Sequence, residues 1–157
     1  MLYYITNMKK TKTKLVMHPD PFAQLLGYHL RRLSVLVMND LSQALAPLAL
    51  KPADVSVLIT VAAHAGITQS NIGRLLGMRR ANLTPLITAL ERRGLIDRKP
   101  VDGRSQGLDL ATKGQVICRQ AQTITRRHEE RLFGSIPVAE RGRLIAQLRA
   151  LWQSPAH

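Results

Sequence analysis

The 157-residue sequence has few of the residues that build disulfide, metal or redox chemistry. It contains one cysteine, Cys118, which excludes an intramolecular disulfide and any site made of several cysteines. Its five histidines are scattered, and none belongs to an HExxH pattern, so no metal site is predicted. The sequence also lacks a nucleophile and base at recognisable spacing and a phosphate-binding glycine loop. We therefore expect neither an enzyme nor a bound cofactor.

Long apolar runs are absent as well. None reaches the roughly 18–20 residues that span a bilayer. The first 20 residues place their lysines after a short apolar stretch, which is unlike a secretory signal peptide. We expect a cytoplasmic protein with no membrane partner, and Met8 and Met17 leave the physiological start open.

Acidic residues are scarce. Asp and Glu number 10 against 23 Lys and Arg, which gives a formal net charge of +13. Such an excess favours a polyanionic partner, although a large charge also serves solubility alone. Residues 1–18 include the run KKTKTK, have no helical or strand pattern, and are predicted to be a disordered basic arm.

The rest of the chain, residues 19–157, is predicted to be a single domain that is mainly helical with a small β-wing. Apolar spacing predicts a helix over 21–46, with Asp20 as its cap, and three further helices between Pro52 and Gly94, of which the middle one is capped by Thr68. Two strands, at 95–99 and 106–110, form a hairpin. A long helix capped by Thr112 and a last helix beginning at Pro137 complete the order.

Two short helices with a glycine-containing turn, followed by a basic hairpin, are typical of a winged helix-turn-helix. This core is predicted to span 50–111. The helices within 21–46 and 112–153 carry more apolar surface than such a core can cover, so we expect them to form a homodimer. In this arrangement the helix beginning near Arg79 would enter the major groove of double-stranded DNA.

The apolar residues Leu83, Leu86, Ile87 and Leu90 recur at helical spacing and are predicted to face inward, which places several polar side chains on the outer face of that helix. Asn82 is suited to read adenine, while Arg79 and Arg80 are suited to guanine or to simple phosphate contact. The predicted DNA-binding residues are Thr68, Gln69, Arg79, Arg80, Asn82, Thr84, Thr88, Arg98, Lys99 and Arg104.

The tip of the predicted wing is Asp102-Gly103-Arg104-Ser105. Gly103 permits a tight loop, and Arg104 is suited to a minor groove, whose negative potential attracts guanidinium groups. Asp102 would repel phosphate and is expected to face inward. An Asp-Gly pair is also a common hairpin turn, so these residues by themselves indicate no more than a turn.

Five segments of the sequence form a recognisable set: LKPADVSVL at 50–58, GITQ at 66–69, LLG at 75–77, LERRGLIDR at 90–98 and DGRS at 102–105. Together they resemble the MarR family of transcriptional regulators. The resemblance spans about 21–152, and its most specific part is the fourth segment followed closely by the fifth. It implies an interlocked dimer, a near-palindromic operator and, usually, a small aromatic or phenolic effector that releases a repressor.

The sequence departs from that family at several positions. Lys51 and Ala111 replace threonines that usually cap helices, and Pro85 removes a backbone hydrogen bond from the recognition helix. The wing has Asp-Gly-Arg where many members have Asp-Arg-Arg. Pro85 also makes the helix similar to the branch that senses organic hydroperoxides, although the reactive cysteine of that branch has no counterpart near the first helix.

The effector site is predicted on the first helix, where an imidazole or guanidinium lies among apolar side chains. A partly buried histidine and a solvated basic face would explain the same residues. The alternatives to an effector-released repressor are an effector-independent or architectural DNA-binding protein, a protein-interaction module, and a redox-responsive regulator acting through Cys118. The effector candidates are Tyr28, His29, Arg32, Leu33 and Leu36.

Overall fold

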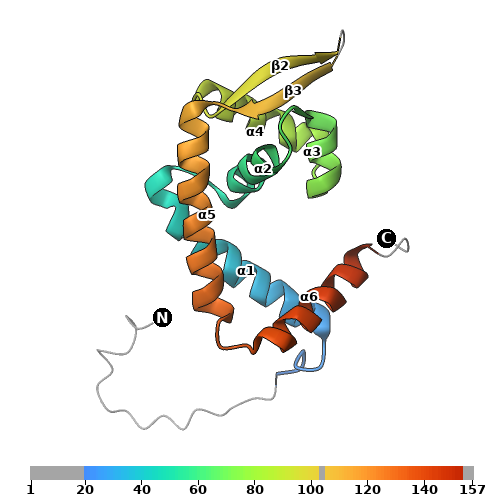
Figure 1. Cartoon of the computed structure of the whole chain (residues 1–157). Coiled ribbons are helices and arrows are strands. Elements are labelled where there is room, and N and C mark those ends of the chain that lie inside the picture. Colours follow the sequence, from blue (N-terminus) through green and yellow to red (C-terminus); the bar gives the residue numbers. More distant parts are fainter. Residues whose placement is uncertain (1–19, 103–104, 154–157) are drawn as a thin grey trace. The chain divides into compact units, whose positions relative to one another are not determined.

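The computed structural model describes residues 20–102 and 105–153 (Figure 1). The predicted arm 1–18, together with Gly103 and Arg104, lies outside these residues. The chain divides into two compact units at the Val35–Leu36 step, and each is considered by itself.

The second unit carries most of the secondary structure. Helix α1 (Leu26–Leu45) enters it and is followed by a short 3-10 turn, η1 (Ala46–Leu48). The remaining elements, in chain order, are α2 (Pro52–Ala63), β1 (Ile67–Thr68), α3 (Gln69–Leu76), α4 (Arg80–Arg92), β2 (Ile96–Asp102), β3 (Ser105–Leu110), α5 (Thr112–Phe133) and α6 (Val138–Gln153).

The beginning of the first helix differs from the prediction. Asp20 does not cap a helix at Pro21, because its carboxylate accepts the Phe22 N–H at 2.9 Å and closes a local turn. Helix α1 therefore begins five residues later, at Leu26. Its end was predicted correctly, since the helix stops at Leu45, directly before the Ala46-Pro47 step.

The sheet has three strands rather than the two expected. Strand β1 pairs antiparallel with β3, with Ile67 opposite Leu108, and β3 pairs with β2 in the order β1-β3-β2. A two-residue strand leaves no period-2 pattern to recognise, which is why the sequence did not reveal it. Strand β1 leads directly into α3, so the sheet and the helix-turn-helix are joined.

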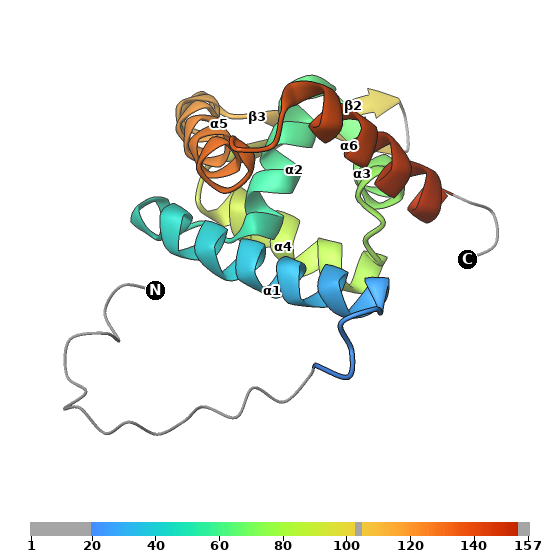
Figure 2. The ribbon, with the colours of Figure 1, turned by 90° about the horizontal axis from the view of Figure 1, so that it is seen from below.

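One apolar core unites the end of α1, helices α2 to α5 and the strands of the second unit, whereas α6 contributes no buried residue to it. Helix α2 lies between α5 and α3 in Figure 1, and α5 is seen nearly end-on beside α2 in Figure 2. The predicted inward residues of α4, Leu83, Ile87 and Leu90, are fully buried, and Leu86 is partly buried. Further fully buried residues of this core are Ile72 in α3, Leu95 just before β2, Ile96 in β2 and Leu108 in β3.

The start of α5 is set by packing and not by a side-chain cap. Thr112 was expected to cap this helix, but Ala111 occupies the cap position and makes no side-chain hydrogen bond there. The Ala111 N–H instead donates to the Leu95 carbonyl at 3.2 Å. Gly114 lies against the same carbonyl so closely that an added Cβ would be 1.9 Å from the oxygen. This contact fastens α5 to the beginning of β2.

Within the described residues, no single helix has the length and apolar character needed to cross a membrane. A bent pair, residues 26–48 with α2, meets these criteria only when the two are taken together.

Candidate DNA-binding site

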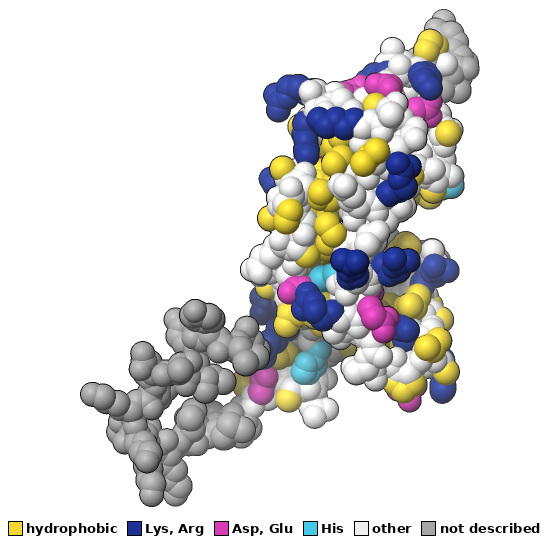
Figure 3. Space-filling view, turned by 60° about the vertical axis from the view of Figure 1, so that its left-hand side comes forward, with side chains coloured by type: hydrophobic (Ala, Val, Ile, Leu, Met, Phe, Trp, Pro, Cys, Tyr) yellow, Lys and Arg dark blue, Asp and Glu magenta, His cyan; other side chains and the backbone are white. Residues whose placement is uncertain are grey.

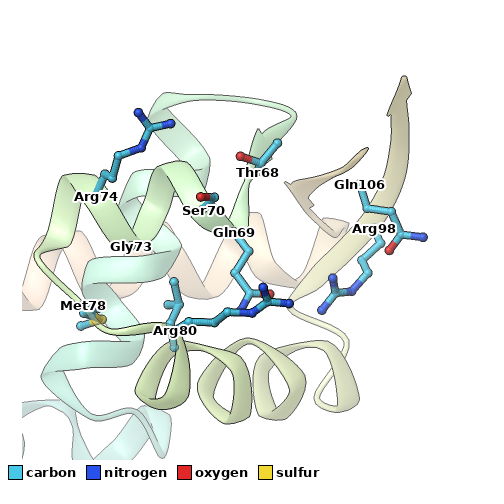
Figure 4. Close-up of a pocket in the computed structure, with 10 residues that line it drawn as sticks. Thr68, Gln69, Ser70, Gly73, Arg74, Met78, Arg80, Arg98 and Gln106 are labelled. Atoms are coloured by element: carbon cyan, nitrogen blue, oxygen red, sulfur yellow. The ribbon is translucent and has the colours of Figure 1, made fainter. Parts of the chain in front are cut away.

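A polar groove of about 780 Å³ lies between α3, α4 and the hairpin (Figure 4). Thr68 lines this groove and also caps α3, since its hydroxyl accepts the Asn71 N–H at 3.4 Å. The basic and polar side chains that line the groove are Thr68, Gln69, Ser70, Arg74, Arg80, Arg98 and Gln106. No acidic side chain belongs to the lining residues that the structure describes.

Helices α3 and α4 are joined across the groove by their own polar groups. The Gln69 side-chain amide donates to the Thr84 hydroxyl at 2.6 Å, and that hydroxyl donates to the Arg80 carbonyl at 2.9 Å. The two predicted DNA-binding residues are therefore brought together. Their hydrogen bonds restrict both rotamers, which prepares a fixed polar surface at the beginning of α4.

The outer face of α4 is free of intramolecular packing. Asn82, Thr84 and Thr88 are all exposed, as are Arg79 and Arg80 at the helix N-terminus. Pro85 lies inside the helix and is exposed on this same face. Because proline has no N–H, the Ala81 carbonyl one turn earlier keeps its acceptor capacity.

Arg98 and Lys99 have different surroundings on β2. Arg98 lines the groove, and its guanidinium binds the Glu91 carboxylate through two contacts, at 2.5 and 3.0 Å. Lys99 does not line this groove. It borders a second hollow of about 410 Å³ with Asp109 and Cys118, because successive strand residues face opposite sides of a sheet.

Asp109 links the hairpin to the segment before α3. One carboxylate oxygen accepts the Gly66 N–H at 2.7 Å, and the other lies 2.9 Å from the Lys99 ammonium. The hydrogen bond from Lys99, followed by that from Gly66, lowers the pKa of the Asp109 carboxyl below its ordinary value. The same pairing raises the pKa of Lys99.

Three of the polar groove residues were not predicted from the sequence: Ser70, Arg74 and Gln106. Ser70 and Arg74 are four residues apart on α3 and so share one helix face, a signal that the sequence does contain. The Arg74 guanidinium donates to Asn71 at 2.5 Å, which orients it on this face. Gln106 reaches the groove from β3, and its position depends on the strand register opposite Pro100.

The wing tip cannot be placed with the groove. Gly103 and Arg104 lie outside the described residues, and Asp102 is described only as the last residue of β2, opposite Ser105. The predicted inward orientation of Asp102 and the minor-groove role of Arg104 stay predictions.

Two of the effector candidates in the first unit, Tyr28 and Arg32, contact each other. Arg32 donates to the Tyr28 hydroxyl at 3.1 Å, and its guanidinium carbon lies 5.5 Å from the centre of the Tyr28 ring. His29 lies 2.8 Å from the Ala23 carbonyl through its Nε2. Leu33, and Leu36 at the start of the second unit, are exposed.

Cys118 is buried in α5, and its desolvation raises the pKa of the thiol. A raised pKa leaves less of the nucleophilic thiolate at neutral pH, which favours a packing role over redox sensing.

A compact three-helix core, an exposed polar face on the second helix of the pair, α4, and an adjoining β-hairpin define a winged helix-turn-helix protein. The family model described as "MarR family" matches residues 50–105. A structure of the transcriptional repressor CouR bound to a 23-mer DNA duplex is 36% identical, with a TM-score of 0.78, and covers 84% of this chain and 95% of that one. The chain belongs to the MarR family of transcriptional regulators.

Two further relatives agree with this assignment. CouR bound to p-coumaroyl-CoA is 33% identical, with a TM-score of 0.78, over 88% of this chain and 99% of that one. A transcriptional regulatory protein for the hcr operon of Thauera aromatica is 27% identical over 132 residues, which cover 82% of this chain and 79% of that protein.

Proposed function

We propose that this regulator is a homodimeric repressor that binds a near-palindromic operator and is released by an aromatic effector. The observation that carries the proposal is the acid-free groove beside an exposed, polar α4. Lys and Arg side chains also spread over the face drawn in Figure 3, with few Asp and Glu among them. Cations placed this way bind the phosphate backbone, and a fixed polar helix face reads bases.

On this proposal, α4 enters the major groove of double-stranded DNA. Asn82 and Thr88 face base edges, whereas Arg79 and Arg80 at the helix N-terminus hold phosphates or a guanine. Gln69 and Thr84 act as one hydrogen-bonded unit. Arg104 at the wing tip would add a minor-groove contact, and Arg104→Ala should then weaken binding and flatten its salt dependence.

A homodimer accounts for apolar side chains that a single chain leaves in water. Leu26 and Leu33 on α1 are exposed, and so are Ile145 and Trp152 on α6. An apolar stripe of this size on two helices is ordinarily buried against another surface. A second copy of the chain supplies that surface. The resulting dimer has two-fold symmetry, which matches the symmetry of a near-palindromic operator.

The proposed effector is an aromatic acid or its coenzyme A thioester. Support comes from the relative bound to p-coumaroyl-CoA and from the cluster of Tyr28, His29 and Arg32 beside exposed leucines. Such a ligand acts by preferring a dimer geometry whose recognition helices do not match successive major grooves. It can shift the equilibrium only by its difference in affinity for the two states.

Fluorescence anisotropy tests both parts of the proposal. Operator sequences are first selected from a random DNA library with the wild-type protein. p-Coumaroyl-CoA, p-coumarate, free coenzyme A and a panel of benzoates are then titrated with and without operator. An effector must bind the free protein more tightly than the DNA complex; equal affinities would leave an effector-independent regulator, and failure to select any sequence would exclude operator recognition.

A further inference from the structure

Arg98, which lines the groove, forms an ion pair with Glu91, a residue outside the groove lining that has no role in the function proposed so far. Glu91 lies in the last turn of α4, and Arg98 is the third residue of β2. The chain reverses between them through Gly94, whose φ of +68° is in the left-handed region, while the Leu95 N–H donates to the Leu90 carbonyl at 3.0 Å. This tight reversal holds the two side chains at a constant separation.

The pair has a definite orientation. Arg98 uses Nε toward Oε1 at 2.5 Å and Nη2 toward Oε2 at 3.0 Å, so both carboxylate oxygens are engaged by one edge of the guanidinium. Of the five N–H bonds of a guanidinium, this leaves both of those on Nη1 and one on Nη2. The remaining edge is a second fork, able to bind two adjacent acceptors.

This second fork belongs to a side chain that lines the groove. Figure 4 shows Arg98 extending from β2 toward the side chains of Gln69 and Arg80. The side chains of Arg98 and Glu91 are 34% and 24% exposed, so a further acceptor can approach. Because Glu91 fixes the plane of the guanidinium, an acceptor is bound well only where it meets that plane.

Glu91 has a second effect, which acts on binding to random DNA. A carboxylate beside the groove repels phosphates wherever the protein contacts DNA without a matched register. It therefore weakens binding to random DNA, while its hold on Arg98 favours the one register in which the free fork meets its acceptors. Both effects increase the difference between operator and random DNA.

We propose that Glu91 is a positioning residue that determines specificity: it aims the free fork of Arg98 at the operator and weakens binding to random DNA. The inference rests on the proposed operator-binding function.

The test measures affinity for selected operator and for random DNA by anisotropy at constant salt. Glu91→Gln should strengthen binding to random DNA and lower the operator-to-random ratio by about fivefold, as expected when a bidentate contact loses its orientation. Asp97→Asn is the matched control, because it removes a carboxylate one residue from Arg98 that is not part of the fork. It should change both affinities alike and leave the ratio unchanged.

A double-mutant cycle separates positioning from charge. In an Arg98→Gln background, Glu91→Gln should lower the ratio by less than it does in the wild type, because the positioning effect is absent and only the repulsion of phosphates is lost. Glu91→Asp, which keeps the charge but shortens the reach, should also lower the ratio; it serves as the second variant if Glu91→Gln fails to fold by circular dichroism. An unchanged ratio in Glu91→Gln, or an equal fall with and without Arg98, overturns the inference. A wild-type ratio of one would instead reject the proposed function itself.

Discussion

In the groove proposed to bind DNA, single polar side chains hold one another in place. Gln69 and Thr84 fix each other and Arg98 is held by Glu91, whereas Asn82 and Thr88 are exposed and have no such hydrogen bond among those described. A side chain free to choose its partner is well placed to discriminate between bases. It also pays more conformational entropy on binding than one already fixed.

Asn82→Ala should therefore reduce the operator's advantage over random DNA by roughly 1–3 kcal/mol, the value of one bidentate base contact. Competition anisotropy with both DNAs measures this difference. Gln120→Ala, which removes an exposed amide from α5, is the control and should have no effect. Equal losses on both DNAs would identify Asn82 as a phosphate contact instead.

Asp109→Asn should lower the free energy of unfolding at pH 7 by about 1 kcal/mol or less, because a charge-assisted hydrogen bond to the Gly66 N–H is weakened in a partly exposed place. The folded-state pKa of Asp109 is lowered, so its contribution is present above the unfolded pKa and is lost as pH falls through the folded value. Lys99 has a raised pKa, and its contribution persists until the pH rises through that value.

Urea denaturation between pH 2 and pH 7 checks this expectation. Wild type and variant should differ at pH 7 and converge in acid, where both lack the carboxylate charge. Asp97→Asn, on the neighbouring strand, controls for the loss of a surface charge. A difference that is independent of pH would show that the Asp109 carboxylate charge does not stabilise the fold.

Among the secondary-structure elements, the junction between the hairpin and α5 is the most constrained. Backbone packs on backbone where Gly114 meets Leu95, and no side-chain motion can relieve a clash there. The beginning of α5 is therefore held rigidly against Leu95 at the start of the hairpin. This rigidity matters for regulation, because a shift of α5 in a dimer would be transmitted to the DNA-binding groove.

Gly114→Ala should destabilise the protein by about 3 kcal/mol or more, since overpacking against backbone forces α5 away from β2. Thermal and urea denaturation at fixed concentration measure the loss. Gly142→Ala in α6, where an added Cβ meets nothing within 4 Å, is the matched control. It should be neutral or slightly stabilising, because alanine is the better helix former. Equal stability of the two variants would contradict the packing described here.

For the molecule as a whole, the unburied apolar stripes predict obligate self-association. Trp152 is the chain's single tryptophan and is 68% exposed in the isolated protomer. If α6 is covered by a second copy, its emission should be blue-shifted at micromolar concentration and should move to longer wavelength on dilution. Sedimentation velocity at the same concentrations gives the mass directly. A monomer at micromolar concentration would exclude the proposed dimer.

Sequence reasoning predicted the winged core closely, because each of its signals is local. Helical apolar spacing identified Leu83, Ile87 and Leu90 as core residues, and Thr68 as the cap of α3. The positions of proline and glycine predicted most helix ends to within a residue or two. These features depend on neighbours within one or two turns of the chain, which a sequence displays directly.

The tertiary structure decided whatever depended on residues distant in the chain. Asp20 and Thr112 both looked like helix caps, yet the first closes a turn and the second yields to a contact between Ala111 and Leu95. Strand β1 exists only because β3 returns beside it, 40 residues later. Local propensities differ by about a kcal/mol, which packing and backbone pairing readily outweigh.

The groove likewise has some features that the sequence determined and others that only the tertiary structure decided. From helical periodicity the sequence determined that the outer face of α4 is polar and exposed, and that arginines stand at its beginning. It could not determine that Arg98 faces the groove while Lys99 faces away, since that depends on which side of the sheet packs on the helices. Nor could it show that Glu91 holds Arg98, because a pairing of two side chains across a turn is set by the three-dimensional course of the backbone.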